Sequence, residues 1–286
     1  MIHDPVIDSV TGKKLVGTRI SRKIPAQAST IALSSAVVVS LITLIGWYVP
    51  GVGAWLPVSG EAVFNQSEWW RPWSACFAHA DVAHLISNLA LFVVFGIFLN
   101  GYFGFWLFPI WAFVLGGIAN LVVLPSYPPD VMVLGASGVV NVLGGLWLSL
   151  FFMISRQYRM PGRILRTLGV ALLLFAPQEF RPNVAERVHA AGLVCGLIFG
   201  FVWFFIFKNR IRSYEIWEEI PPDDPEDELP PEEGVVIEAA EFLGGPYGSQ
   251  NQNDEQNRED FKLHLVDVEK ADIEKTRDEK NDRGDR

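Results

Sequence analysis

The sequence predicts an all-α membrane protein, a bundle of six transmembrane helices followed by a disordered acidic tail. Half of the 286 residues are apolar, with 10 Trp and 20 Phe, which is too apolar for an ordinary soluble domain of this size. Six apolar runs approach the roughly 20 residues that cross the hydrocarbon core of a bilayer. Charge is scarce in these runs and concentrated near the C-terminus, so the chain divides into a membrane core and a polar tail.

The predicted spans follow one another closely along the chain. The first lacks a small-residue cleavage site, so it is expected to stay as a signal anchor. The second and third nearly abut, which predicts a tight hairpin at Asn100 and Gly101. The fifth has the shortest apolar core. The six predicted spans cover residues 31–49, 82–101, 103–124, 131–154, 164–177 and 188–207.

Basic residues predict how these spans are oriented. Lys and Arg gather before the first span, between the fourth and fifth, and after the sixth. Six spans with both termini in the cytoplasm place all three clusters on the cytoplasmic side. We therefore expect an integral, multi-pass protein of a bacterial plasma membrane. Residues 1–28 form the N-terminal cytoplasmic segment and residues 29–210 the membrane domain.

The remaining residues, 211–286, have a different composition. Residues 1–207 carry 12 Lys and Arg against 8 Asp and Glu, whereas residues 208–286 carry 11 against 24. The overall charge of −9 thus belongs to the tail, which is too polar to bury a core and is expected to be disordered. Its two short apolar patches, residues 235–243 and 261–268, are either docking motifs for a cytoplasmic partner or transient local structure. No basic patch with interleaved aromatics predicts nucleic-acid binding.

Ser137 is the first candidate for chemistry, at the head of the fourth apolar run. A serine in a span often only bonds to its own helix. Here Gly135 and Gly138 flank it, which leaves its hydroxyl uncrowded and lets another backbone approach. The first amides of a helix are also free to bind an anion. Ser137 therefore has the setting of a nucleophile with part of an oxyanion site beside it.

His189 heads the sixth run and is the candidate base. Gly192, Gly196 and Gly200 follow it at offsets that fall on one helical face, the face of the imidazole. A helix packed through glycine lies close to its neighbour, and if that neighbour carries Ser137, the two side chains are within reach. The alternative is an interfacial histidine. No Asp or Glu occurs inside a predicted span, so the pattern favours a Ser–His dyad without an acid.

His84 and Asn88 share a face of the second span and can both donate hydrogen bonds. In a serine hydrolase they suit the oxyanion, and the alternative is a structural bond between helices. A metal site of His79, His84 and His189 lacks a carboxylate and the His-Glu-x-x-His motif. Cys76 and Cys195 have neither metal nor disulfide spacing. No metal or cofactor is therefore expected.

Taken together, these residues resemble the rhomboid family of intramembrane serine proteases over roughly residues 65–205. The resemblance implies a six-helix rhomboid-like bundle with Ser137 as nucleophile and His189 as general base and acid. It implies an oxyanion site of His84, Asn88 and the Ser137 amide. The matching motifs are Trp70-Arg71, His79, His84-Leu-Ile-Ser-Asn88, Gly135-Ala-Ser137-Gly138 and His189-Ala-Ala-Gly192-Leu-Val-Cys-Gly196.

The resemblance also implies what the protein acts on and where this chain differs. Its substrates would be membrane-anchored proteins, cut in or near a transmembrane segment beside a small residue. Trp70 and Arg71 would shape the first outer loop, which Pro72 stiffens. Many rhomboids carry an aromatic ring four residues after the serine. Asn141 stands there in this chain and is a candidate to position His189 by a hydrogen bond.

Two other functions remain open from the sequence. One is a non-proteolytic relative that binds membrane clients and controls their fate, an interpretation that Asn141 and the long tail favour. The other is a small transporter or channel, which the lack of spans lined by ionisable pathway residues and of a visible inverted repeat disfavours.

Overall fold

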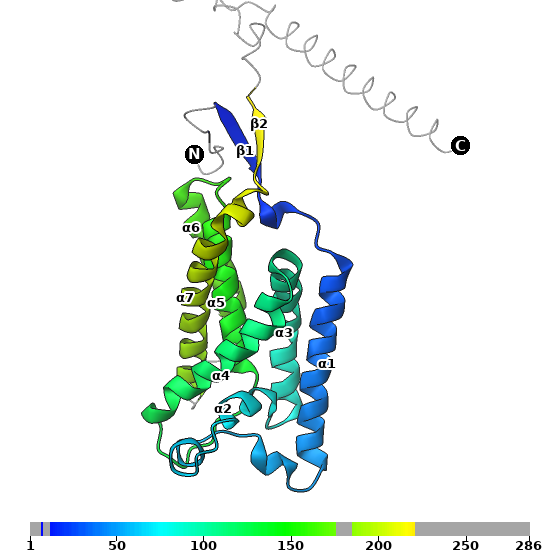
Figure 1. Cartoon of the computed structure of the whole chain (residues 1–286), viewed down its shortest axis with the longest axis vertical. Coiled ribbons are helices and arrows are strands. Elements are labelled where there is room, and N and C mark those ends of the chain that lie inside the picture. Colours follow the sequence, from blue (N-terminus) through cyan, green and yellow to red (C-terminus); the bar gives the residue numbers. More distant parts are fainter. Residues whose placement is uncertain (1–6, 8–11, 176–184, 221–286) are drawn as a thin grey trace, which may run out of the picture. The chain divides into compact units, whose positions relative to one another are not determined.

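The computed structural model describes residue 7 and residues 12–175 and 185–220 (Figure 1). It is an integral-membrane fold of long helices, as the sequence predicts. Within the described residues, five helical segments are long and apolar enough to cross a membrane. They are α1 (Ala26–Tyr48), α3 (Val82–Phe103), the segment Trp106–Ser126, α5 (Ser137–Ile154) and the segment Glu186–Arg212 of α7 (Ala185–Arg212).

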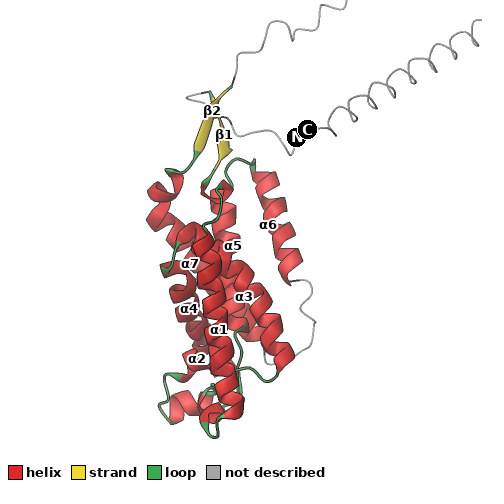
Figure 2. Ribbon diagram, turned by 90° about the vertical axis from the view of Figure 1, so that its right-hand side faces the viewer, coloured by secondary structure: helices red, strands yellow, loops and turns green. Residues whose placement is uncertain are grey.

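A sixth helix, α6, covers Met160–Phe175. It corresponds to the fifth predicted span, whose last two residues lie outside the described part of the chain. Its 16 residues fall short of the length of the other spans, and Arg163 and Arg166 lie in its first two turns. α6 contacts α5, and Figure 2 shows it running beside the other helices.

α5 forms the centre of the bundle. In its most apolar window 78% of the residues are buried, compared with 22% in α7 and 28% in α1. A helix apolar on every side belongs either inside a protein or in lipid. α5 is therefore the buried axis on which α3, α4, α6 and α7 pack. α1 packs on α3, and both α1 and α7 turn most of their apolar surface outward.

The turn after α3 differs from the predicted hairpin at Asn100 and Gly101. α3 continues to Phe103, and the chain reverses at Gly104, where φ is +91° and glycine carries no Cβ penalty. Asn100 still stabilises the connection, because its side-chain amide donates to the Phe108 carbonyl at 2.9 Å. The third span then begins as a π-helical turn, η5 (Trp106–Trp111), and continues as α4 (Ala112–Val123) and η6 (Leu124–Ser126).

Residues 131–136 are a loop, although the fourth predicted span begins at Val131. Val133 pairs with Val58 through two backbone hydrogen bonds of 2.9 and 2.7 Å. The chain enters the helix only after Gly135, whose φ of +122° is incompatible with a helix. The long segment before α3 that supplies Val58 also contains η2 (Val52–Trp55), η3 (Glu61–Asn65), α2 (Arg71–Ser74) and η4 (Ala75–Phe77).

A two-stranded sheet ties the residues before the first helix to those after the last. β1 (Lys13–Gly17) pairs antiparallel with β2 (Ile216–Glu219), at the end of the helices opposite α2 (Figures 1 and 2). The Arg19 guanidinium, in η1 (Arg19–Ser21), stacks 4.5 Å from the centre of the Tyr214 ring. The predicted tail thus begins with ordered residues. Its remainder, with both apolar patches, lies outside the described residues.

Candidate active site

Ser137 is the first residue of α5, and the loop before it is held by hydrogen bonds. The Gly135 amide donates to the Ala75 carbonyl at 2.9 Å, and the Ala136 amide donates to His79 Nε2 at 3.2 Å. The amides of the first helical turn have no acceptor within the helix. The loop therefore presents Ser137 beside backbone amides that have no acceptor in their own helix.

His79 supports this loop with both of its ring nitrogens. Because Nε2 accepts from Ala136, the proton lies on Nδ1, which is 3.0 Å from Thr43 Oγ1. Thr43 in turn donates to the Phe77 carbonyl at 2.6 Å. Burial, reinforced by repulsion from His84, lowers the pKa of His79 to about 4. A neutral ring whose two nitrogens bond to the protein is a positioning residue and leaves no lone pair for a metal.

His84 contacts the loop before Ser137, residues 131–136, which we call the serine loop. Its backbone amide donates to the N-cap side chain of Asp81 at 2.8 Å, which fixes the start of α3. Its ring stands edge-on to His79, with centroids 5.2 Å apart. A Cβ added to Gly135 would lie 2.8 Å from the His84 ring, so glycine at this position is what admits the imidazole.

Asn88 lies one turn further along α3, on the face of His84, and is 8% exposed. Its Nδ2 is buried and has no hydrogen-bond partner among the described residues. An amide donor left without an acceptor in an apolar bundle is costly. Such a group is typical of a site that is completed by a ligand.

The face of α7 that carries Gly192, Gly196 and Gly200 packs on α5. Since α5 begins with Ser137, it is the neighbour that the dyad requires. A Cβ at Gly192 would lie 2.5 Å from the Gly138 carbonyl oxygen, and one at Gly196 would collide with the Val142 carbonyl. His189 therefore lies one turn from a backbone contact with the first turn of α5. Its Nε2 is buried and lacks a hydrogen-bond partner within the described residues, so the Ser137 hydroxyl does not bond to it here.

The environment of His189 differs in two ways from the prediction. α7 begins before residue 188, which brings the exposed carboxylate of Glu186 into the helix. Glu186 and His84 both act on the imidazole electrostatically rather than by hydrogen bonds. Asn141 does not bond to His189: its Nδ2 donates to the Ser137 carbonyl at 2.9 Å, four residues back in the same helix. That carbonyl is the acceptor that an asparagine inside a helix meets first.

Arg71 makes several contacts within the first outer loop. Its guanidinium donates to the Ala54 and Pro57 carbonyls at 2.8 and 2.9 Å and forms an ion pair with Glu68. Trp70 stacks on Trp55, with ring centroids 6.3 Å apart.

Three supporting residues escaped the sequence analysis. Thr43 bridges α1 to His79, and Trp47 donates from Nε1 to the His79 carbonyl at 2.7 Å. Asn120 in α4 is 2% exposed and donates to the Pro72 carbonyl at 2.7 Å, holding α2 in place. A polar residue within an apolar run was the available signal for Thr43 and Asn120, the same signal that identified Asn88.

Ser137, His189, His84 and Asn88 lie in a part of the chain that is similar in sequence to known proteins. A model of the rhomboid domain matches residues 66–210. Rhomboid protease GlpG of Haemophilus influenzae is 28% identical over 154 residues, covering 52% of this chain and 77% of that protein.

Two further relatives are longer proteins of which the chain matches less than half. Rhomboid-related protein 1 of Caenorhabditis elegans is 28% identical over 57% of this chain and 47% of its own length. RHOMBOID-like protein 1 of Arabidopsis thaliana is 25% identical over 53% of this chain and 41% of its own length. Relatives in a bacterium, an animal and a plant do not single out the bacterial source that we expected.

Proposed function

Since the chain belongs to the rhomboid family, we propose that it is an intramembrane serine endopeptidase with Ser137 and His189 as a catalytic dyad. It cleaves membrane-anchored proteins in or near a transmembrane segment. The observation that carries the proposal is that two buried polar atoms, His189 Nε2 and Asn88 Nδ2, have no hydrogen-bond partner among the described residues. One is a proton acceptor and the other a hydrogen-bond donor, the two functions that acyl transfer from a serine needs.

Each side chain has a defined part in the proposed reaction. His189 Nε2 takes the proton of the Ser137 hydroxyl as Oγ attacks the scissile carbonyl carbon, and it then gives that proton to the leaving amine. The developing oxyanion accepts hydrogen bonds from the Ser137 amide, His84 and Asn88 Nδ2. Water then attacks the acyl-enzyme, and His189 Nε2 takes a proton from the water and returns it to Ser137 Oγ. In a free enzyme the bond between nucleophile and base is often long, and it shortens when substrate binds.

The support at the serine loop suits this reaction. Oxyanion donors act best when they need no rearrangement at the moment of reaction. The bonds from Gly135 to Ala75 and from Ala136 to His79 fix the backbone directly before Ser137. We propose that the site faces the outer side of the membrane and that both termini are cytoplasmic, as the three basic clusters predict.

Asn141 is the observation that favours a second function. Its amide is occupied by the Ser137 carbonyl, so the base lacks both an aromatic ring and a hydrogen-bonded orienting group among the described residues. A protein that binds membrane clients without cutting them is the alternative. It predicts client binding that is the same with and without the Ser137 hydroxyl, and no product.

The test of the dyad is covalent labelling together with cleavage. A fluorophosphonate should label the purified full chain in detergent, and the chain should cut a model substrate with one transmembrane helix. Ser137→Ala and His189→Ala should each lower cleavage by about 10³-fold or more. Ser40→Ala is the matched control, since the Ser40 hydroxyl only donates to the Ala36 carbonyl of its own helix. Cleavage that survives Ser137→Ala would sink the proposal.

A further inference from the structure

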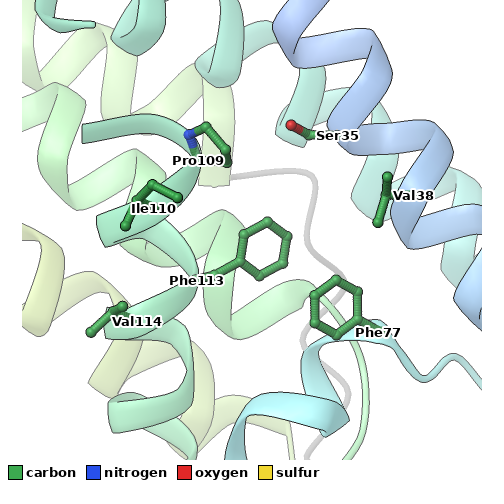
Figure 3. A pocket seen from close by; sticks show the side chains of 7 residues that line it. All are labelled: Ser35, Val38, Phe77, Pro109, Ile110, Phe113 and Val114. Atoms are coloured by element: carbon green, nitrogen blue, oxygen red, sulfur yellow. The ribbon is translucent and has the colours of Figure 1, made fainter. Parts of the chain in front are cut away.

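A cavity of about 410 Å³ lies between α1 and the segment formed by η5 and α4 (Figure 3). Its size falls in the range of roughly 300–1,000 Å³ that is typical of ligand sites. It is open toward the outside of the bundle, and the stacked rings of Phe77 and Phe113, 4.9 Å apart, form part of its wall. The lining residues are Ser35, Val38, Phe77, Pro109, Ile110, Phe113 and Val114.

The chemistry of the wall excludes a polar ligand. Ser35 carries the only side-chain hydroxyl among the lining residues, and that hydroxyl donates to the Ile31 carbonyl at 2.9 Å. No charged group lines the cavity. A water molecule needs two to four polar partners, and among the lining side chains it would find only the acceptor oxygen of Ser35.

The position of the cavity indicates what fills it. Val38 is near the middle of α1, and Pro109, Ile110 and Val114 belong to the third apolar segment, so both walls are membrane spans. A cavity left empty in such a wall loses packing contacts in proportion to its volume. At this depth the surrounding medium is hydrocarbon, and the opening gives that medium access.

We propose that this cavity binds one acyl chain of a membrane lipid. An open cavity lined by seven residues accommodates a single flexible chain. A partner helix instead needs a groove several turns long, with anchor positions at i, i+3, i+4 and i+7. The bound chain completes the contact between α1 and α4 that the protein's own side chains leave open.

The acyl chain also supports the candidate active site, because Phe77 belongs to both structures. The ring of Phe77 faces the cavity, while its carbonyl accepts from Thr43. Thr43 bonds to His79, and His79 accepts from Ala136, the residue directly before Ser137. An acyl chain in the cavity therefore packs against Phe77. Through Thr43 and His79, this contact supports the loop directly before Ser137.

Photolabelling tests the site independently of catalysis. The full chain with Ser137→Ala is reconstituted into phosphatidylcholine vesicles that contain a phosphatidylcholine with a diazirine midway along one acyl chain. Val37, Val38 and Leu41 are similarly exposed, at 56%, 49% and 52%, but only Val38 lines the cavity. Adducts on Val38, Ile110 and Val114 should exceed those on Val37 and Leu41 by about tenfold, which corresponds to about 1.4 kcal/mol of preference.

Matched substitutions decide between the cavity and general exposure to lipid. Val38→Trp fills the cavity and should remove the excess labelling of Ile110 and Val114, whereas Val37→Trp should leave it intact. Equal labelling of all lipid-facing positions would overturn the proposal. So would labelling of the cavity by a photoreactive transmembrane peptide in vesicles where the lipid probe fails to label it, since the occupant is then a helix.

The effect on the serine loop rests on the proposed function and is measured separately. Cleavage by the wild-type chain and by Val37→Trp should vary with the acyl-chain length of the vesicle lipid, and cleavage by Val38→Trp should vary less. If no variant cleaves, the proposed function fails while the labelling result stands. If cleavage depends equally on chain length in all three, the link from the cavity to the serine loop is wrong.

Discussion

α7 and α1 lie on different sides of the bundle and are attached in opposite ways. α7 meets α5 backbone to backbone through Gly192 and Gly196, and Gly200 lies against the Ser149 hydroxyl, with no room for a Cβ at any of the three. α1 packs on α3 through the small buried residues Ala28, Ala32 and Ala36, and a cavity of about 410 Å³ separates it from α4. The two candidate catalytic side chains are carried by the tightly packed pair.

This difference separates two requirements of the site. The relative position of Ser137 and His189 depends on two helices that cannot approach or separate without breaking glycine contacts. The support of the serine loop depends on α1, through single hydrogen bonds from Thr43 and Trp47. Substitutions on the α7 side should therefore act on geometry and be severe, and those on the α1 side should act on stability and be graded.

Outside the candidate dyad, the largest effect is expected from Gly196→Leu. The new side chain collides with the Val142 carbonyl, so α7 must move away from α5 and takes His189 with it. Overpacking of this kind costs about 1–3 kcal/mol, and a displacement near 1 Å lowers a reaction rate by about 100-fold. Thermal unfolding in detergent and cleavage rates measure the two effects.

Gly169→Leu in α6 is the control for Gly196→Leu. A Cβ at Gly169 meets nothing within 4 Å, so cleavage should stay within about twofold of wild type. Wild-type cleavage by Gly196→Leu would show that the α5–α7 contact does not set the geometry of the dyad.

Thr43→Val should have the next largest effect. It leaves His79 Nδ1 and the Phe77 carbonyl without partners at nearly unchanged volume, which costs about 1–3 kcal/mol of stability. Ser40→Ala on the same helix removes a hydroxyl that bonds only to its own helix and should cost less than about 0.5 kcal/mol. Equal unfolding temperatures for the two variants would contradict the assigned support.

His79 predicts a pH dependence of stability. The pKa of the ring is about 4 in the folded chain, below its ordinary value near 6.5. Between these two pH values the ring is protonated in the unfolded chain and neutral in the folded chain. Stability should fall as pH decreases from about 6.5 to 4, by up to about 1.4 kcal/mol per pH unit, and His79 should have no effect above that window.

His79→Gln tests this dependence, since its side-chain oxygen can accept from the Ala136 amide at every pH. Unfolding curves of the variant should show a shallower decline between pH 6.5 and 4 than those of the wild type. The same slope in both would assign the decline to groups other than His79.

The smallest effect is expected from Asn141→Ala. It removes one hydrogen bond within α5, worth about 0.5–1.5 kcal/mol, and no bond to His189. Cleavage should fall by no more than about tenfold. A loss as large as that of His189→Ala would restore Asn141 as the group that positions the base.

The parts of the fold that follow from local pattern could be predicted from the sequence. The length and apolar composition of each run predict the helices, and the spacing of Gly192, Gly196 and Gly200 predicts which face of α7 packs. Both are properties of one continuous segment. The faces of His84 and Asn88 follow in the same way. The assignment of these residues to a reaction remains a prediction.

The parts that depend on distant segments could not be predicted. The serine loop rests on His79, and His79 on Thr43, 36 positions earlier and on another helix. Whether the Asn141 side-chain amide donates within its own helix or to His189 depends on which acceptor is nearest. The start of α5 at Ser137, rather than at Val131, follows from a pairing between Val133 and Val58 that no local pattern reveals.

The pairing of β1 with β2 has a consequence for counting membrane crossings. Lys13–Gly17 precedes the first helix and Ile216–Glu219 follows the last, yet the two strands share hydrogen bonds, so no bilayer separates them. A chain that starts and finishes on one side must cross an even number of times. Among the residues that the structure describes, five helical segments qualify by length and composition, which is odd. We therefore expect the short helix α6 to supply the remaining passage, as the span least matched to the thickness of the hydrocarbon.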